Sequence, residues 1–297
     1  MQGLILINKP KGITSFGVVA AVRRLCGTKR VGHTGTLDPL AEGVLPVLVG
    51  RATSLSNYVT ESEKSYTARV RLGITTDTED ITGNILSESP VCISEEKLFA
   101  VAESFLGVCD QIPPMFSAIK KDGERLYKLA RQGETVEREP RQIEIKKITV
   151  RDFDGTEFYL DVACSKGTYI RSLCRDIGEK LGCGATLTEL VRTSTAGFSI
   201  CDAVKLDYLT QENISDYFLS PDKAVLKMPY LCITEKQAVR FCNGGELDIA
   251  RTGLKCATDG MCLRIKYNDV LLGIGRVQTD TNSIKVECVI NNKDGSD

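Results

Sequence analysis

Residues 32–46 read Gly-His-Thr-Gly-Thr-Leu-Asp-Pro-Leu-Ala-Glu-Gly-Val-Leu-Pro and contain the only histidine of the chain, His33. The three glycines of this stretch predict a loop. Asp38 lies between Leu37 and Pro39, and it is the first acidic residue of the chain, after six basic residues. A single carboxylate that follows a run of cations indicates chemistry on a polyanion, in which the cations hold phosphates and the acid acts on the substrate.

The dipeptide Asp38-Pro39 also has a purely structural interpretation. Aspartate is a common N-cap, and proline is favoured at the first position of a helix. On these two residues alone a helix cap is the favoured interpretation. The two roles are compatible, because a capping position fixes the side chain.

Length and composition describe an ordinary globular protein. The 297 residues suffice for one large domain plus a small one, or for two medium domains, and 42% are hydrophobic and 26% charged. No apolar run is long enough to cross a bilayer. Residues 1–4 do not begin a basic and then apolar leader, so we expect a cytoplasmic protein that is not bound to a membrane.

The twelve cysteines do not follow a metal-binding pattern. The sequence has no Cys-x-x-Cys pair, and one histidine cannot complete a zinc array of cysteines and histidines. We therefore expect no bound metal, and interpret the cysteines as buried free thiols that pack as small hydrophobic side chains.

The net charge of −1 conceals an uneven distribution of charge. Residues 1–37 carry six basic groups and no acid, and residues 119–151 carry ten basic groups against six acidic ones. Residues 72–96 carry six acidic groups and no base. Ordinary solvated charge explains the acidic stretch, but it explains the acid-free amino terminus poorly. We expect separate basic and acidic surfaces.

Hydrophobic periodicity, together with residues that favour turns and helix ends, predicts an alternation of strands and helices. Thr14 and Ser15 begin a predicted helix that ends at Gly27, and Ser94 begins one that ends at Gly107. Residues 203–229 look like a linker. The other expected strands are 3–8, 44–49, 64–72, the hairpin of 142–153 with 156–164, and several runs up to 290; the other expected helices are 51–60, 124–132, 168–181 and one that begins at Thr234.

Several short motifs, in order, resemble those of one enzyme family, the TruB family of tRNA pseudouridine synthases, which isomerise uridine 55 in the T arm. Any one of them could arise by chance, but together they could not. Besides residues 32–46, the motifs are Asn8-Lys9-Pro10-Lys11-Gly12-Ile13-Thr14-Ser15, Lys64-Ser65-Tyr66, Cys164-Ser165-Lys166-Gly167-Thr168-Tyr169-Ile170-Arg171, Leu187-Thr188-Glu189-Leu190-Val191-Arg192 and Gly197-Phe198.

The resemblance implies a fold and a domain organisation. Residues 1–229 would form the α+β catalytic domain of a pseudouridine synthase, a mixed, largely antiparallel sheet flanked by helices. A thumb-like insertion would occupy about residues 112–141, and residues 230–292 would form a small β-rich PUA-like RNA-binding domain. In the thumb, Arg125, Lys128 and Arg131 recur every three residues. Alone, this pattern favours a solvated helix face; the resemblance favours contact with RNA.

The resemblance also implies catalytic residues. Asp38 matches the essential aspartate, which acts as nucleophile or stabilises an oxocarbenium-like species. Arg171 matches the arginine that pairs with this aspartate, because a guanidinium stays charged and offers a fork of donors. Tyr66 matches the tyrosine that stacks on the flipped uracil, and its hydroxyl is a candidate acceptor of the C5 proton.

Four further residues are candidates for substrate binding. His33 matches the histidine that fills the gap left by the extruded nucleotide, which offsets part of the cost of extrusion. Tyr169 and Leu190 match positions that line the uracil pocket, although packing in the core is an alternative for both. Lys9 is expected to support the active-site loop or to contact a phosphate.

The reaction that the resemblance implies needs neither oxidation nor an energy source, so we expect no cofactor. The sequence has no Walker loop and no dinucleotide-binding fingerprint. The expected partner is tRNA, through its T-arm stem-loop. We expect a monomer with no obligate protein partner.

Two other functions remain open on the sequence. One is a guide-RNA-dependent synthase of the Cbf5 or dyskerin type, which shares the core motifs; the segment 112–141 and the short carboxy-terminal module favour the stand-alone tRNA enzyme instead. The other is a tRNA-folding chaperone in which catalysis is secondary.

Overall fold

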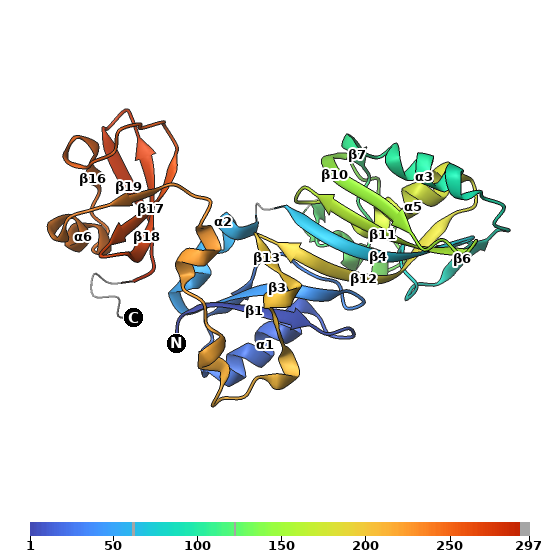
Figure 1. Ribbon diagram of the computed structural model, residues 1–297, viewed down its shortest axis with the longest axis horizontal. Coiled ribbons are helices and arrows are strands. Elements are labelled where there is room, and N and C mark those ends of the chain that lie inside the picture. Colours follow the sequence, from blue (N-terminus) through green and yellow to red (C-terminus); the bar gives the residue numbers. More distant parts are fainter. Residues whose placement is uncertain (61–62, 122, 292–297) are drawn as a thin grey trace.

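The computed structural model describes residues 1–60, 63–121 and 123–291, in which two β-sheets dominate (Figure 1). The last residue of the expected carboxy-terminal module, 292, lies outside the described residues. The order of the main strands in the large sheet is β14 (Val204–Lys205), β1 (Gly3–Lys9), β3 (Glu42–Val49), β12 (Ala185–Thr195), β4 (Lys64–Leu72), β11 (Glu157–Cys164), β10 (Arg141–Arg151) and β7 (Gly107–Gln111). Two short strands extend it: β2 (Val31–His33) pairs with β3, and β13 (Phe198–Ser199) pairs with β12.

The remaining strands form three smaller sheets. The five-stranded sheet has the order β15 (Tyr230–Cys232), β17 (Cys262–Tyr267), β18 (Val270–Gln278), β19 (Ser283–Val289) and β16 (Leu247–Asp248). The two-stranded sheets are β5 (Ile74–Thr76) with β6 (Ile85–Glu88), and β8 (Lys120–Lys121) with β9 (Glu124–Arg125). The α-helices are α1 (Ser15–Cys26), α2 (Ser56–Thr60), α3 (Glu95–Glu103), α4 (Leu126–Arg131), α5 (Ile170–Leu181) and α6 (Glu235–Cys242).

Local signals set most helix boundaries where the sequence predicts them. Thr14 caps α1 by accepting a hydrogen bond from the amide of Gly17, and Gly27 ends the helix in the left-handed conformation. Ser94 caps α3 as predicted. The predicted end of α3 at Gly107 is wrong, because the helix stops at Glu103 and Gly107 begins the edge strand β7.

The central strand β12 is not predicted by periodicity, although one of the family motifs lies within it. It pairs with β3 in parallel and with β4 in antiparallel register, and so joins the two halves of the sheet. Only this pair and the pair of β1 with β14 are parallel within the large sheet of the described chain, so the sheet is mixed and largely antiparallel as expected. Helix α5 packs on β12, and α3 packs on β10.

Residues 203–229 are not the linker that the sequence suggested. Strand β14 extends the sheet next to β1, and the backbone of Leu219 exchanges two hydrogen bonds with Leu4, at 3.0 and 2.7 Å. Leu209 and Ile214 are buried in the main core. Apolar side chains spaced too irregularly to show a period therefore fix this segment on the large sheet.

The five-stranded sheet packs against the outer face of β1 and β3, at the end of the molecule opposite α3 (Figure 1). Leu271, Ile274 and Ile290 share one core with Leu4 and Leu6. The amide group of Gln2 also donates to the carbonyl of Ile290 at 3.2 Å. This apolar core holds the carboxy-terminal module, residues 230–291, against the large sheet.

The cysteines are less buried than expected. Each of the twelve is a free thiol, but only Cys164, Cys174 and Cys183 are buried. The expectation of buried thiols is wrong for four exposed ones: Cys92, Cys201, Cys232 and Cys256. In the described part of the chain, every helix is too short or too polar to span a membrane.

Gly43 generates a prediction about stability. Its φ of +109° favours glycine, and a Cβ atom there would lie 2.2 Å from the carbonyl oxygen of Arg192 on β12. We expect Gly43→Ala to lower the free energy of unfolding by at least about 3 kcal/mol, because β12 and β3 would have to separate. Urea denaturation followed by circular dichroism measures this loss.

Gly155, in the turn between β10 and β11, is the matched control. Its φ of +101° is similar, but no atom lies within 4 Å of its added Cβ. Gly155→Ala should therefore cost only the conformational strain, about 1–2 kcal/mol. Equal losses in the two variants would contradict a contact that is specific to Gly43.

Candidate active site

Asp38 lies in the loop between β2 and β3, and no helix follows it. Residues 39 and 40 form a bend, and the amide of Ala41 donates to the carbonyl of Asp38 at 3.1 Å. The helix-cap interpretation of Asp38-Pro39 is therefore wrong. The carboxylate side chain remains 41% exposed, so a substrate can reach it.

The segment 9–15 holds this loop on both sides of Asp38. The hydroxyl of Ser15 donates to the carbonyl of Leu37 at 2.9 Å and accepts from the amide of Leu37 at 2.8 Å. The amide of Gly12 donates to the carbonyl of Pro39 at 2.8 Å. Two of the sequence motifs thus meet, and together they fix the backbone that carries the carboxylate.

Lys9 supports this arrangement from inside the protein. Its side chain is fully buried, and Nζ donates to the carbonyls of Pro10 and Ile13 at 2.9 and 2.8 Å. Burial lowers the pKa of Lys9 to about 8, although the charges of Glu42 and Asp38 act in the opposite direction. Of the two roles expected for Lys9, contact with a phosphate is wrong, because a fully buried amine cannot reach RNA.

Arg171 forms the expected ion pair with Asp38. Its Nη2 lies 2.8 Å from Oδ2 of Asp38, although the arginine side chain is only 5% exposed. Nη1 donates to the carbonyl of Thr78, and Nη2 donates to that of Phe116, both at 2.9 Å. Oδ2 of Asp80 lies 3.8 Å from Nε. These contacts fix the plane of the guanidinium, and so orient the carboxylate.

The loop 77–83 supplies residues that sequence analysis missed. Asp80 is buried, and its Oδ1 accepts from the amide of Thr82 at 3.0 Å. Glu79, at a φ of +63°, accepts from the hydroxyl of Ser172 at 2.6 Å and pairs with Arg175. Solvated charge is therefore the wrong interpretation for these two acids. Arg171 and Arg175 lie one turn apart and so share one face of the predicted helix. This spacing was the signal in the sequence that two cations on that face require buried acidic partners.

Tyr66 and Leu190 come from the two central strands. Tyr66 on β4 and Leu190 on β12 are each 8% exposed, and both belong to the core that includes Leu37 and Leu40 of the active-site loop. Burial raises the pKa of Tyr66. The charge of Asp38 also acts on the phenol of Tyr66, so this ring lies near the carboxylate.

Tyr169 precedes the first residue of α5, which starts two residues later than predicted. Its amide donates to Oε1 of Gln111 at 2.8 Å, and its carbonyl accepts from Nε2 at 3.1 Å. Burial raises the pKa of Tyr169, and the charges of Asp38 and Arg171 both act on its phenol. The ring therefore lies near the ion pair, as its assignment to the uracil pocket requires.

His33 ends the short strand β2 and is half-buried. Its Nδ1 has no hydrogen-bond partner in the described part of the chain. Burial, and then the positive charge of Arg192, lower the pKa of His33, so the imidazole is neutral at pH 7. A neutral planar ring beside the active-site loop suits the stacking role that the resemblance implies.

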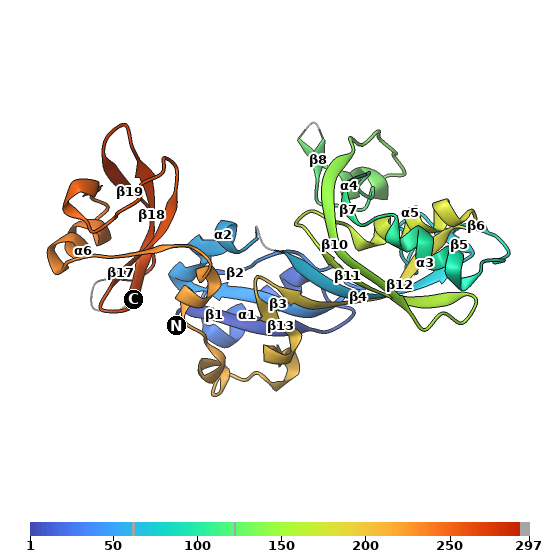
Figure 2. The same cartoon turned by 45° about the horizontal axis from the view of Figure 1, so that its top comes forward.

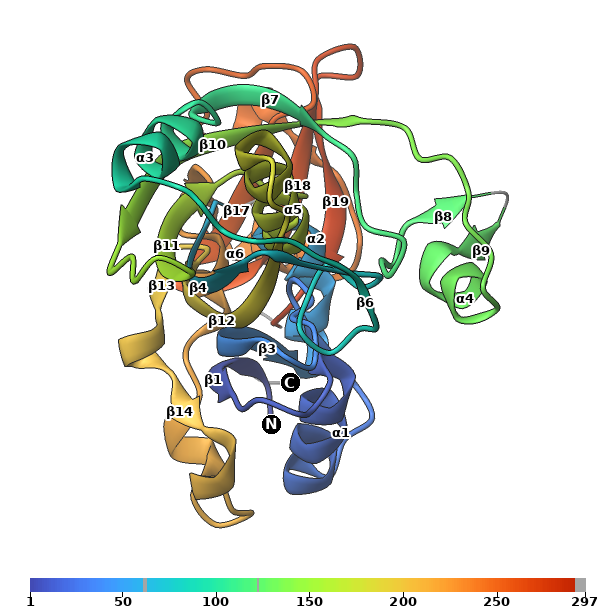
Figure 3. The same ribbon diagram turned by 90° about the vertical axis from the view of Figure 1, so that its right-hand side faces the viewer.

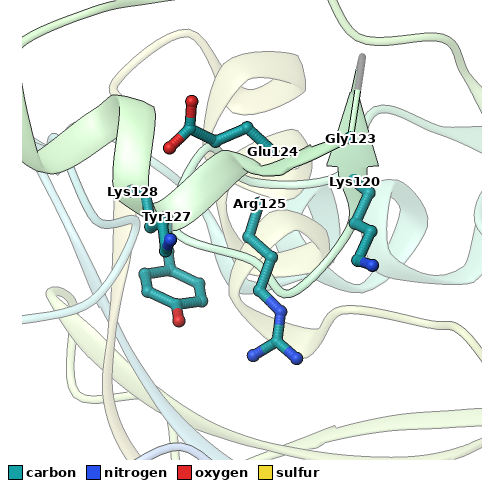
Figure 4. A pocket seen from close by; sticks show the side chains of 6 residues that line it. All are labelled: Lys120, Gly123, Glu124, Arg125, Tyr127 and Lys128. Atoms are coloured by element: carbon teal, nitrogen blue, oxygen red, sulfur yellow. The ribbon is translucent and has the colours of Figure 1, made fainter.

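The thumb projects from the sheet as β8, β9 and α4 (Figures 2 and 3). Helix α4 starts at Leu126, so the predicted helix 124–132 is too long, and Arg125 precedes it. The ring of Tyr127 contacts the guanidinium groups of Arg125 and Arg131, at 6.0 and 5.4 Å from the ring centre. Arg125 and Tyr127, together with Lys120 and Lys128, line an open hollow of about 520 Å³ (Figure 4).

Comparisons with known proteins agree with this geometry. Residues 23–170 match the TruB family pseudouridylate synthase (N terminal domain), and residues 171–226 match the tRNA pseudouridylate synthase B C-terminal domain. A tRNA pseudouridine synthase B of Clostridium kluyveri is 46% identical over 82% of this chain and 84% of its own length. One of Clostridium perfringens is 42% identical over 97% of this chain and 98% of its own length.

Solved structures extend the agreement to the fold. A chain of a Cbf5-Nop10-Gar1 complex superposes with a TM-score of 0.75 at 27% identity, over 99% of this chain and 86% of that one. A chain of an archaeal box H/ACA sRNP Nop10-Cbf5 complex gives 0.73 at 26% identity, over 98% and 87%. The expected pseudouridine synthase fold with its PUA-like module is therefore confirmed. The chain belongs to the TruB family of pseudouridylate synthases.

Proposed function

We propose that this chain isomerises uridine 55 in the T loop of tRNA to pseudouridine. The observation that carries the proposal is the accessible carboxylate of Asp38, held by the buried guanidinium of Arg171 at 2.8 Å. The relatives named tRNA pseudouridine synthase B match the chain over nearly its full length, which supports tRNA as the substrate.

The reaction breaks the bond between ribose C1′ and uracil N1, turns the base, and joins C1′ to C5. The C5 proton leaves, and N1 gains a proton. An ionised carboxylate next to the nucleoside is required by each of three possible routes: attack of Asp38 at C6, attack of Asp38 at C1′, and elimination. Arg171 neutralises this charge and fixes its direction, while the anchors at Leu37 and Pro39 hold the backbone.

The nucleoside must leave the stacked T loop to reach Asp38, which costs a few kcal/mol in such extrusions. His33 fills the vacated space in the loop as a neutral ring. Tyr66 stacks on the uracil, with Tyr169 and Leu190 completing the pocket, and the Tyr66 hydroxyl receives the C5 proton.

Removal of the carboxylate should abolish the reaction. We expect wild type to release one tritium per molecule from a T-arm stem-loop labelled at uridine C5, and Asp38→Ala to slow the release by at least about a thousandfold, which corresponds to about 4 kcal/mol. Asp207→Asn, a change at an exposed acid, is the control and should keep full activity. Undiminished release by Asp38→Ala would remove Asp38 from the mechanism.

The tritium-release assay and one cellular test separate the alternative functions. The purified chain alone should act on the stem-loop, whereas a guide-RNA-dependent enzyme would need an added guide. A tRNA-folding chaperone should keep its cellular role in an Asp38→Asn variant. Loss of that role would favour a pure modifying enzyme.

Arg171 should matter for catalysis more than for binding. We expect Arg171→Ala to lose most activity yet bind the stem-loop, because the phosphates are held elsewhere. Arg171→Lys should restore little, since one ammonium cannot replace the planar fork that reaches Asp38, Thr78 and Phe116 together. Single-turnover rates and fluorescence-anisotropy binding measure the two effects, with thermal unfolding as the check on folding. Complete loss of binding would refute this role.

The thumb should supply phosphate contacts. We expect Arg125→Gln and Arg131→Gln each to weaken stem-loop binding and to reduce the slope of log K against log salt by about 0.7–0.9. Lys97→Gln on α3, a helix that lies well apart from the thumb (Figure 3), is the control and should change neither quantity. An unchanged slope in both thumb variants would favour the solvated-face interpretation.

A further inference from the structure

Arg192 is a buried cation that the proposed mechanism does not use. It is the largest side chain that is completely inaccessible to solvent. Within residues 1–60, 63–121 and 123–291, no carboxylate forms an ion pair with it. A buried guanidinium without a carboxylate is costly, so its retention at this place calls for a specific role.

The guanidinium is tied to the active-site loop. Its Nε donates to the carbonyl of Val44 at 2.9 Å, and Nη2 donates to that of Gly35 at 3.1 Å. Nη1 has no hydrogen-bond partner among the described residues, although it is buried. Arg192 therefore holds the two ends of the loop that carries Asp38, and one donor group remains available.

Tyr66 is the residue next to this guanidinium. The two are direct partners across the antiparallel pair of β4 and β12, so their side chains leave the sheet on the same face. The positive charge of the guanidinium acts on the phenol and lowers its pKa. The guanidinium and the phenol thus share one face of the sheet at paired positions.

Arg192 is the positively charged group that acts most strongly on the phenol of Tyr66. Burial raises the pKa of Tyr66, and Cys164 on β11 and Asp38 in the loop raise it further, while Arg192 lowers it. Burial also raises the pKa of the Cys164 thiol to about 11, so it stays neutral near pH 7. His33, which also faces Arg192, is neutral there too.

We propose that Arg192 is a positioning residue for Tyr66, directing its hydroxyl toward the flipped base and stabilising the phenolate that removes the C5 proton. This inference rests on the proposed function. After C5 has bonded to C1′, the C5–H electron pair forms the C5–C6 double bond. The electron pair of the C6–N1 double bond moves onto N1, which takes a proton from water. The phenolate becomes a phenol, which returns its proton to solvent.

The pH dependence of tritium release tests this role. Without the cation the phenolate is harder to form, so Arg192→Met should release tritium at least about tenfold more slowly than wild type at pH 7, a factor equal to one pKa unit. The difference in release rate between Arg192→Met and wild type should shrink as pH rises, because the Tyr66 phenolate then forms without the cation. Arg192→Lys, which keeps the charge, should lie between the two. A deficit that stays constant at every pH would overturn the proposal.

Two further measurements separate positioning from a merely structural effect. In the first, Tyr66 is replaced by 3-fluorotyrosine, a more acidic phenol, in the Arg192→Met variant. This replacement should restore tritium release near neutral pH. If Arg192→Met does not fold, the same replacement is made in Arg192→Lys. Absence of rescue in a folded variant that binds RNA would contradict the proposal. The control is Arg69→Met, which removes a partly exposed arginine of β4, the strand that carries Tyr66. This variant should leave the pH profile of tritium release unchanged.

The outcomes distinguish this inference from the function on which it rests. If wild type releases no tritium from the T-arm stem-loop, the proposed function fails. If wild type releases tritium and Arg192→Met follows a parallel pH profile, the proposed function stands and only the role of Arg192 is refuted.

Discussion

The ion pair between Asp38 and Arg171 is the interaction around which the catalytic body is arranged. Its two partners differ in exposure: the carboxylate is open to a ligand, while the guanidinium is buried at the first turn of α5. Burying a cation costs several kcal/mol unless every donor is satisfied. The carbonyls of Thr78 and Phe116 accept hydrogen bonds from this guanidinium, and the carboxylate of Asp80 lies 3.8 Å from its Nε. Loops far apart in sequence must therefore converge on one side chain before the site exists.

Backbone carbonyls satisfy much of the remaining buried positive charge. Lys9 donates to two carbonyls of the segment that anchors the loop, and Arg192 donates to two carbonyls at the ends of the loop itself. Neither cation forms an ion pair with Asp38, which leaves that carboxylate to Arg171 and to the substrate. Both buried cations instead stiffen the loop, so that Asp38 is held in place before RNA arrives.

The carboxy-terminal module and the thumb differ in how firmly they are fixed. The carboxy-terminal module shares an apolar core with β1, so its position relative to the site is set by packing. The thumb consists of short elements, and its hollow is lined by Arg125, Lys128 and the ring of Tyr127. A rigid module and a small basic projection on one body suit a folded RNA hairpin, which is recognised by its shape and its phosphates.

The sequence by itself determined the helix caps at Thr14 and Ser94 and the family, because caps and motifs depend on residues close together in the chain. The pairing of Asp38 with Arg171 was available only through the resemblance to that family. Only the tertiary structure decided that β12 joins the two halves of the sheet and that Asp38 caps no helix. It alone revealed that Asp80 and Arg192 are buried beside the site. Burial and partner choice depend on contacts between residues that lie a hundred positions apart, and local patterns carry no record of such contacts.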